Sequence, residues 1–336
     1  MKVRTLAVIA LALVLAACAK PFVQGPLRPD ASFTGPRIEA DAFVVQDGAR
    51  LPYWSWAPDG REPWAAVVAL HGMNDHKAAF RLAGPEWAKA GVVTYSYDQR
   101  GFGQAPGRGT WAGPLMVEDL RTVVALVRAR HPEATIAVVG ESMGGAVAIE
   151  AFASDRPPVA DRLVLLAPAV WGWSAQNPFN RASLWVSARL LGSRAVTAPD
   201  WAVRDIRASD NIEALIANGR DPDFIKATRF DALHGLVDLM EAASEDLGRV
   251  KGPTLMLYGA NDQIIRPGPT LRALERAGSP ANLHTGFYPD GWHLLNRDLQ
   301  RDVVFRDVES FLRDPAAPLP SGVRPVGEGI RALRKR

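Results

Sequence analysis

Apolar runs alternate with amphipathic segments along most of this 336-residue chain. The runs are rich in Val, Leu, Ile and aromatic side chains and end near Gly, Pro or Asp, which predicts buried strands. The amphipathic segments between them, such as 115–131 and 267–277, predict helices. Apolar strands separated by helices are typical of a mostly parallel sheet covered on both faces, so we expect an α/β fold. The predicted core strands lie at 64–72, 91–101, 135–142, 162–169, 253–262 and 282–290.

The alternation is interrupted once, over 171–245, where helical patterns occur without a convincing buried strand. We interpret this stretch as a helical cap inserted into one core, because the strand pattern resumes at Pro253. The alternative is an unrelated second domain. The core then consists of 38–170, which opens with a predicted hairpin, and 246–314.

The N-terminal sequence has the features of a secretion signal. Lys2 and Arg4 precede an apolar run over 6–17 that is too short to span a bilayer, which predicts a signal peptide over 1–17. The run ends in LAAC and resembles the lipobox of bacterial lipoproteins, whose cysteine is lipidated. Cys18 is the only cysteine of the chain, so we expect a lipid anchor on it that holds the protein in the cell envelope. The residue after it is not the aspartate associated with inner-membrane retention, which favours the periplasmic face of an outer membrane. A plain secretory leader is the alternative.

The two ends also carry the basic charge. The segment 18–37 is rich in Pro and Gly and predicts an extended tether, whose 19–37 part would reach up to roughly 60 Å. The tail 315–336 holds five basic residues and one acidic residue, and we expect it to be solvated and disordered. Lys2 and Arg4 contribute +2 and the tail contributes +4, so the rest of this chain, whose net charge is +3 and whose pI is near 9.1, carries a net −3. We therefore expect no nucleic-acid partner.

A serine stands where a predicted strand meets a predicted helix. Ser142 lies between Gly140 and Gly144, directly after the strand at 135–142. A sharp turn there strains the serine backbone and exposes its hydroxyl, and the glycines avoid collisions with the neighbouring backbone. The helix N-terminus favours negative charge near the serine. The pattern predicts a nucleophile, with an inert serine in a tight turn as the alternative.

A serine nucleophile needs a histidine base and an acid that orients it, and on this kind of fold they follow in the order serine, acid, histidine. Asp262 is the last residue of the predicted strand at 253–262, and His293 follows the last predicted strand, at 282–290. Asp290 is the rival acid. The backbone N–H groups of Met73 and Met143 are the expected donors to the oxyanion, one in the loop after the first core strand and one directly after the nucleophile.

Five short sequences carry a resemblance to a known family. HGMNDH, YDQRGFGQ, GESMGG, GANDQII and DGWH together resemble an α/β-hydrolase of the monoacylglycerol lipase and lysophospholipase-like group, which is related to serine aminopeptidase-like hydrolases. The resemblance covers roughly 38–312 and includes the cap. The sequence differs from the family pattern at Asn74-Asp75, where the lipases commonly have Gly-Glu.

The resemblance implies a serine ester hydrolase that cleaves a single-acyl lipid, a lysophospholipid or a monoacylglycerol, through an acyl-enzyme intermediate. A general carboxylesterase or an aminopeptidase on the same triad, and a non-enzymatic lipoprotein scaffold, are the alternatives. Apolar cap residues would line an acyl channel or merely pack the cap onto the core. No clustered Cys and His ligands and no phosphate-binding Gly-rich loop occur, so we expect no metal and no organic cofactor. The apolar cap residues are Trp171, Trp173, Phe179, Leu184 and Trp185.

Overall fold

The computed structural model describes residues 19–199, 204–278 and 280–334. The predicted signal peptide and the lipidation site at Cys18 lie outside the described residues. Within those residues, every helix is too short or too polar to span a bilayer.

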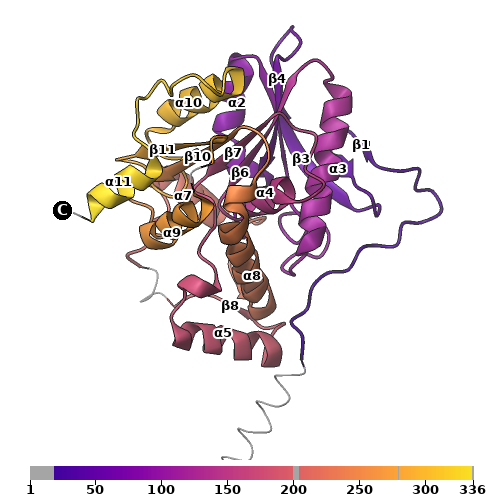
Figure 1. Ribbon diagram of the computed structural model, residues 1–336. Helices are drawn as coiled ribbons and strands as arrows, with labels where there is room; N and C mark the ends of the chain where they lie inside the picture. The colour runs from indigo at the N-terminus through magenta and orange to yellow at the C-terminus, as the bar shows by residue number, and fades with distance from the viewer. Residues whose placement is uncertain (1–18, 200–203, 279, 335–336) are drawn as a thin grey trace, which may run out of the picture.

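A nine-stranded sheet forms the centre of the molecule (Figure 1). The strands follow the order β1-β2-β3-β5-β4-β6-β7-β10-β11. All pairs from β5 to β11 are parallel, and the pairs β1–β2, β2–β3 and β3–β5 are antiparallel. The predicted mostly parallel α/β sheet is therefore confirmed. The strands are β1 (Arg37–Ile38), β2 (Ala42–Val44), β3 (Arg50–Trp56), β4 (Ala65–Leu70), β5 (Val92–Tyr97), β6 (Thr135–Glu141), β7 (Arg162–Leu166), β10 (Thr254–Gly259) and β11 (Leu283–Tyr288).

Helices cover both faces of this sheet, as the continuous apolar strands predict. Alternate residues of β4 face opposite sides, since side chains alternate along a strand. Val68 and Leu70 join an apolar cluster with α3, α4 and α8, whereas Val67 and Ala69 join a second cluster with α2 and α10. The core helices are α2 (Ala83–Lys89), α3 (Pro114–Arg130), α4 (Met143–Ala153), α8 (Phe230–Asp246), α9 (Pro267–Ala277) and α10 (Arg301–Arg313).

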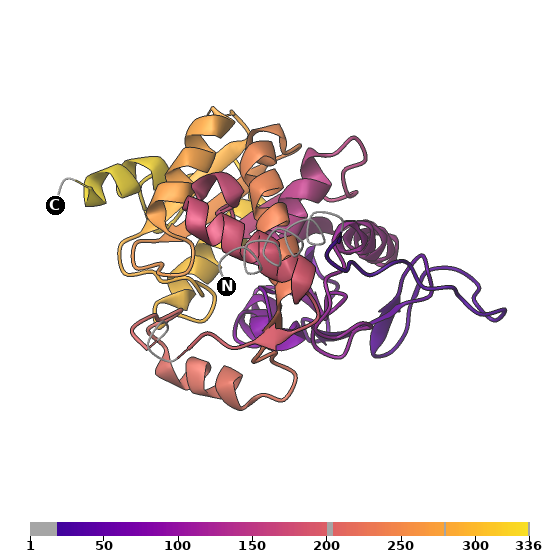
Figure 2. The same cartoon turned by 90° about the horizontal axis from the view of Figure 1, so that it is seen from below.

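In its described residues, 167–199 and 204–253, the segment between β7 and β10 contains helices and one small strand pair. It contains α5 (Pro178–Leu190) and α7 (Ile212–Arg220), and the short strands β8 (Ala195–Val196) and β9 (Thr228–Arg229) pair antiparallel. α8 packs against both α4 and α5, so it links the cap to the core. Figure 2, seen from below, shows α5 in front of α8, with α7 apart from it.

The N-terminal segment lies against the core instead of extending freely as a tether. The N–H of Gln24 donates to the carbonyl of Trp111 at 2.8 Å, and the N–H of Leu27 donates to the Asp47 carboxylate at 2.7 Å. Before them, the ring of Phe22 lies 5.9 Å from the Arg229 guanidinium. These contacts fasten the segment from residue 22 onward.

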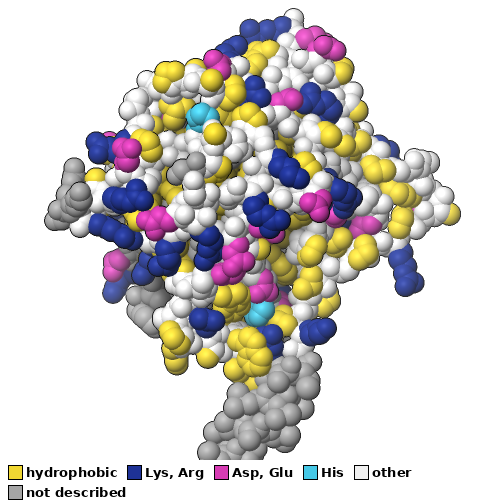
Figure 3. All heavy atoms as spheres, in the orientation of Figure 1, with side chains coloured by type: hydrophobic (Ala, Val, Ile, Leu, Met, Phe, Trp, Pro, Cys, Tyr) yellow, Lys and Arg dark blue, Asp and Glu magenta, His cyan; other side chains and the backbone are white. Residues whose placement is uncertain are grey.

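The basic tail is also ordered, in contrast to the expectation of a disordered end. It forms α11 (Val326–Leu333), whose Val326 and Ile330 are fully buried against Tyr258 and Phe287. The apolar residues of the helix therefore face the core while its basic residues stay outside. On the face in Figure 3, basic and acidic side chains are interspersed.

Candidate active site

Ser142 occupies a strained turn at the end of β6. Its backbone has φ 54° and ψ −117°, and it directly precedes α4. A methyl group on Gly140 would lie 2.6 Å from the Gly144 carbonyl oxygen, and one on Gly144 would lie 2.5 Å from that of Leu70. Both positions thus require glycine for the reason expected from the sequence. Strain of this kind is kept where the surroundings enforce it, often at functional sites.

His293 and Asp262 form a buried pair. The Nδ1–H of His293 donates to Oδ2 of Asp262 at 2.9 Å, and each residue is 4% exposed. The N–H groups of Ile264 and Ile265 donate to the other carboxylate oxygen, Oδ1, at 2.8 Å each. This arrangement fixes the carboxylate and leaves Nε2 of His293 free to accept a proton. Asp290, the rival acid, is exposed.

The charge of Asp262 also sets the pKa of His293. Burial alone would lower that pKa, but the Asp262 carboxylate raises it above the ordinary value of 6.5. The pair therefore stabilises the imidazolium form of His293. This is the form that a general base adopts after it takes a proton.

The predicted oxyanion donors lie beside the serine. A methyl group on Gly72 would lie 3.2 Å from Cβ of Ser142, so the loop that continues into Met73 passes next to it. Met143 is the first residue of α4, and N–H groups in the first turn of a helix have no partner within the helix. The roles of both amides stay predictions.

The structure explains how an asparagine can stand at position 74, where the lipases commonly have glycine. Asn74 has φ 66°, a backbone region that favours glycine and admits asparagine more readily than other residues. Its side chain also donates to Oγ1 of Thr228 in the cap at 2.7 Å. The asparagine therefore keeps the turn and adds a contact to the cap.

His71, which ends a predicted strand, has both ring nitrogens engaged. Its Nδ1–H donates to the Gly72 carbonyl at 2.8 Å, and its Nε2 accepts from the N–H of Gln99 at 3.0 Å. Burial lowers the pKa of His71, which favours this neutral form. His71 therefore has a structural role and is not a competing base.

A buried arginine beneath the site was not anticipated from the sequence. Arg297 donates from Nη1 to Asp75 at 2.7 Å and from Nη2 to Glu141 at 2.5 Å, and it is 0% exposed. Glu141 directly precedes Ser142, and Arg297 follows His293 by four residues. One guanidinium thus ties together the loops that carry the nucleophile, the base and Met73.

Burial and the neighbouring charges shift the pKa values of the two acids in opposite directions. For Asp75, burial would raise the pKa, but Arg297 brings it below its ordinary value. For Glu141, burial raises the pKa in spite of Arg297. Arg297 therefore favours the ionised form of both acids, against the effect of burial.

We expect Arg297→Met to destabilise the protein by about 3–5 kcal/mol, because removal of one member of a buried ion pair leaves the other charges uncompensated. Urea unfolding at neutral pH measures the loss. The matched control is Arg306→Met on the exposed side of α10, which should change the stability by less than about 0.5 kcal/mol. Equal stabilities of the two variants would contradict the role assigned to Arg297.

The apolar cap residues do not form one common surface. Trp171 and Leu184 pack against the large core cluster, and so does Trp173, whose Nε1–H also donates to Asp238 at 2.6 Å. Trp185 lies under the guanidinium of Arg189, 3.9 Å from it. Phe179 is 80% exposed. Packing therefore accounts for three of the five, whereas the Phe179 ring is exposed to solvent.

Comparisons with known proteins show the family and the fold of this chain. The family model described as serine aminopeptidase, S33, matches residues 61–300. The monoacylglycerol lipase of Mycolicibacterium smegmatis is 27% identical over 81% of this chain and 95% of its own length, and the monoglyceride lipase of Mus musculus is 24% identical over 84% and 93%. The structure of a soluble variant of monoglyceride lipase from Saccharomyces cerevisiae superposes with a TM-score of 0.67 at 19% identity, over 87% of this chain and 100% of that one. The chain belongs to the serine aminopeptidase S33 family, a family of serine hydrolases with the α/β-hydrolase fold.

Proposed function

We propose that this protein hydrolyses the ester bond of single-acyl lipids, with a monoacylglycerol or a lysophospholipid as substrate. The observation that carries the proposal is the buried His293–Asp262 pair, which lies at the same edge of the sheet as the strained Ser142 turn. The similarity to monoacylglycerol and monoglyceride lipases supports the lipid ester as the substrate class.

In the proposed reaction the Ser142 hydroxyl attacks the acyl carbonyl carbon while Nε2 of His293 takes its proton. The N–H groups of Met73 and Met143 stabilise the oxyanion of the tetrahedral intermediate. His293 then returns the proton to the departing alcohol oxygen, which leaves the acyl group on Ser142. A water molecule, deprotonated by His293, then attacks the carbonyl carbon of this ester, and His293 returns the proton to Oγ of Ser142 as the bond to the acyl group breaks and the fatty acid leaves. Asp262 stabilises the imidazolium in both steps.

Two measurements test this function. A fluorophosphonate probe should label Ser142, which separates an enzyme from a non-enzymatic scaffold. Hydrolysis of monoacylglycerols, lysophospholipids, short p-nitrophenyl esters and aminoacyl amides then separates a lipase from a general carboxylesterase and an aminopeptidase. We expect the two lipid esters to be cleaved fastest. Fastest cleavage of the amides or of the short esters would contradict the proposal.

The exposed cap residue gives a sharper test of the acyl site. Phe179→Asp should lower kcat/KM for a long-chain monoacylglycerol by about tenfold, which is the expected effect of losing one large apolar contact. Acetyl esters should be affected little, because they do not reach the cap. Val159→Asp, at a side chain that is 57% exposed in the loop before β7, is the matched control. Equal losses on long and short esters would remove Phe179 from the acyl site.

We also propose that the enzyme is attached to the cell envelope through a lipid on Cys18, at the periplasmic face of an outer membrane. Lipoproteins of this kind carry two or three acyl chains, and several chains hold a protein durably where one is marginal. Wild type should sediment with membranes and incorporate labelled palmitate, and Cys18→Ala should do neither. A soluble, unlabelled wild-type protein would contradict the anchor and leave the hydrolase proposal unaffected.

A further inference from the structure

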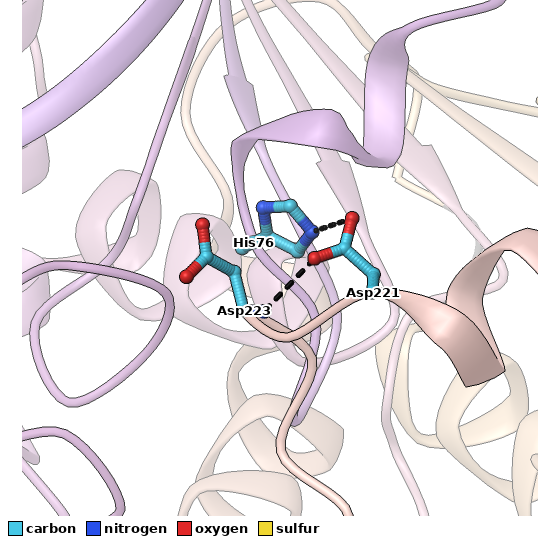
Figure 4. Close-up of side chains that lie close together, drawn as sticks. All are labelled: His76, Asp221 and Asp223. Carbon is cyan, nitrogen blue, oxygen red and sulfur yellow. Dashed lines mark hydrogen bonds and ion pairs between the residues drawn. The ribbon is translucent and has the colours of Figure 1, made fainter.

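Three potential metal ligands meet where the cap contacts the core (Figure 4). His76 lies three residues after Met73, at the end of the same loop, and Asp221 and Asp223 follow α7 in the cap. Nε2 of His76 is 3.1 Å from Oδ2 of Asp221, and one ligand atom of each residue lies within 4.8 Å of the others. The close-up shows the imidazole between the two carboxylates.

Neighbouring groups orient both carboxylates. The N–H of Asp223 donates to Oδ1 of Asp221 at 2.8 Å, and the side-chain amide of Gln104 donates to Oδ2 of Asp223 at 2.9 Å. Among the described residues Oδ1 of Asp223 has no hydrogen-bond partner. The Asp221 carboxylate is thus oriented from within the cluster and the Asp223 carboxylate by Gln104, and Oδ2 of Asp221 and Oδ1 of Asp223 are the oxygens left to bind an ion. Metal-binding carboxylates and histidines are commonly oriented by such outer contacts.

The cluster carries negative charge that nearby arginines do not offset directly. Arg108 donates to the backbone carbonyls of Pro222 and Asp223, and Arg81 donates to the Asn218 side chain. Neither arginine contacts one of the two carboxylates through an ion pair in the described part of the chain.

His76 is the only basic group paired with Asp221 among the described residues, and it is itself 4% exposed. Its Nδ1 atom is buried and has no partner within the described ranges. The other ring nitrogen, Nε2, faces Asp221 and is therefore the atom that would bind an ion in this cluster.

We propose that His76, Asp221 and Asp223 bind one divalent transition-metal ion, zinc being the probe of choice. One imidazole nitrogen with two carboxylate oxygens suits zinc and its neighbours, whereas calcium and magnesium prefer oxygen ligands alone. Zinc binds such ligands at about 2.0–2.2 Å, which places adjacent ligand atoms about 3.3–3.6 Å apart in a tetrahedral site. The observed 3.1 Å between Nε2 of His76 and Oδ2 of Asp221 is slightly shorter than this spacing, and the ligand atom of Asp223 lies within 4.8 Å of both, so small side-chain shifts would complete the site.

The ion would fasten the cap to the loop that carries Met73. Two other contacts join the same segments, since the N–H of Ile225 donates to the Asn74 carbonyl at 2.8 Å and Asn74 donates to Thr228. The proposed site is structural: the ion takes no part in ester hydrolysis, and its binding is measured without a substrate.

Isothermal titration of the chelator-treated, full-length protein with zinc chloride at neutral pH tests the proposal. Wild type should bind one zinc ion per chain. Asp223→Asn, which keeps the side-chain shape, should weaken binding by at least about tenfold. Glu213→Gln removes an exposed acid from α7 of the same cap and should bind as wild type does. His76→Gln provides a second ligand variant, and circular dichroism verifies that each variant folds.

Absence of a saturable site in wild type would overturn the proposal. The same affinity in wild type and in the folded ligand variants would also overturn it, because zinc would then occupy another position such as the His234–Asp238 pair. Neither result would bear on ester hydrolysis.

Discussion

Replacement of Ser142 by alanine is expected to lower ester hydrolysis by at least roughly 10⁴-fold, because the nucleophile is lost while the oxyanion donors and the substrate site remain. Folding should be unaffected. Serine and alanine both carry a Cβ, so the strain at φ 54° is the same for the two residues. Fluorophosphonate labelling should disappear together with the activity.

The matched control is Ser154→Ala at the opposite end of α4, where the hydroxyl donates to the Ala151 carbonyl at 2.7 Å. This variant should keep nearly full activity and labelling. The kinetic comparison requires protein with an unchanged thermal unfolding midpoint. Retention of more than a few per cent of the activity by a folded Ser142→Ala protein, free of contaminating hydrolase, would show that another residue is the nucleophile.

Asp262→Asn is expected to reduce kcat by about 10³- to 10⁴-fold. The amide can still accept hydrogen bonds from Ile264 and Ile265 through its oxygen, so the turn should keep its shape. Its NH₂ group then faces Nδ1 of His293, which favours the wrong tautomer and no longer stabilises the imidazolium. The loss should appear in kcat with little change in KM.

Asp290→Asn serves as the control, because Asp290 is also acidic and close to His293 in sequence but is exposed in the structure. We expect it to keep nearly full activity. The opposite pattern, an inactive Asp290→Asn beside an active Asp262→Asn, would assign the orienting acid to Asp290.

The sheet and the Ser142 turn were predictable because each depends on a sequence pattern within a few neighbouring residues. A strand buried on both faces must be apolar throughout, and all six residues of β4 and of β10 are buried. The Ser142 turn needs glycine on both sides for reasons that lie within a few residues of it. In a parallel sheet, residues that follow different strands gather at one edge, so chain order also pointed to Asp262 and His293.

The charged contacts beneath and beside the site could not be predicted in this way. Arg297 is 222 positions from Asp75 and 156 from Glu141, and no periodic pattern links residues so far apart. The same holds for His76 and Asp221, which meet only because the cap returns to the core. The sequence analysis therefore expected no metal, although the fold brings three metal-binding side chains together.

The ends of the chain were misjudged for a related reason. The composition of the tail, rich in arginine, hides the two apolar positions that bury α11. Likewise, the Pro- and Gly-rich composition of the N-terminal segment indicates an extended backbone but does not say whether that backbone is fastened. Gln24 and Leu27 bind mainly to backbone and to one carboxylate, contacts that leave no pattern in the sequence.

The contacts that hold Gln24 and Leu27 against the core would limit how far the enzyme could move from the proposed anchor at Cys18. Gln24 follows Cys18 by six positions, which span at most roughly 20 Å, about a third of the reach expected for a free tether. If the proposed lipid is attached to Cys18, so short a connection would keep the folded body next to the bilayer and allow it mainly to change its orientation. Encounters with the proposed lipid substrates would then be a two-dimensional search, governed by lateral diffusion and by the orientation of the body, and not by partitioning from solution.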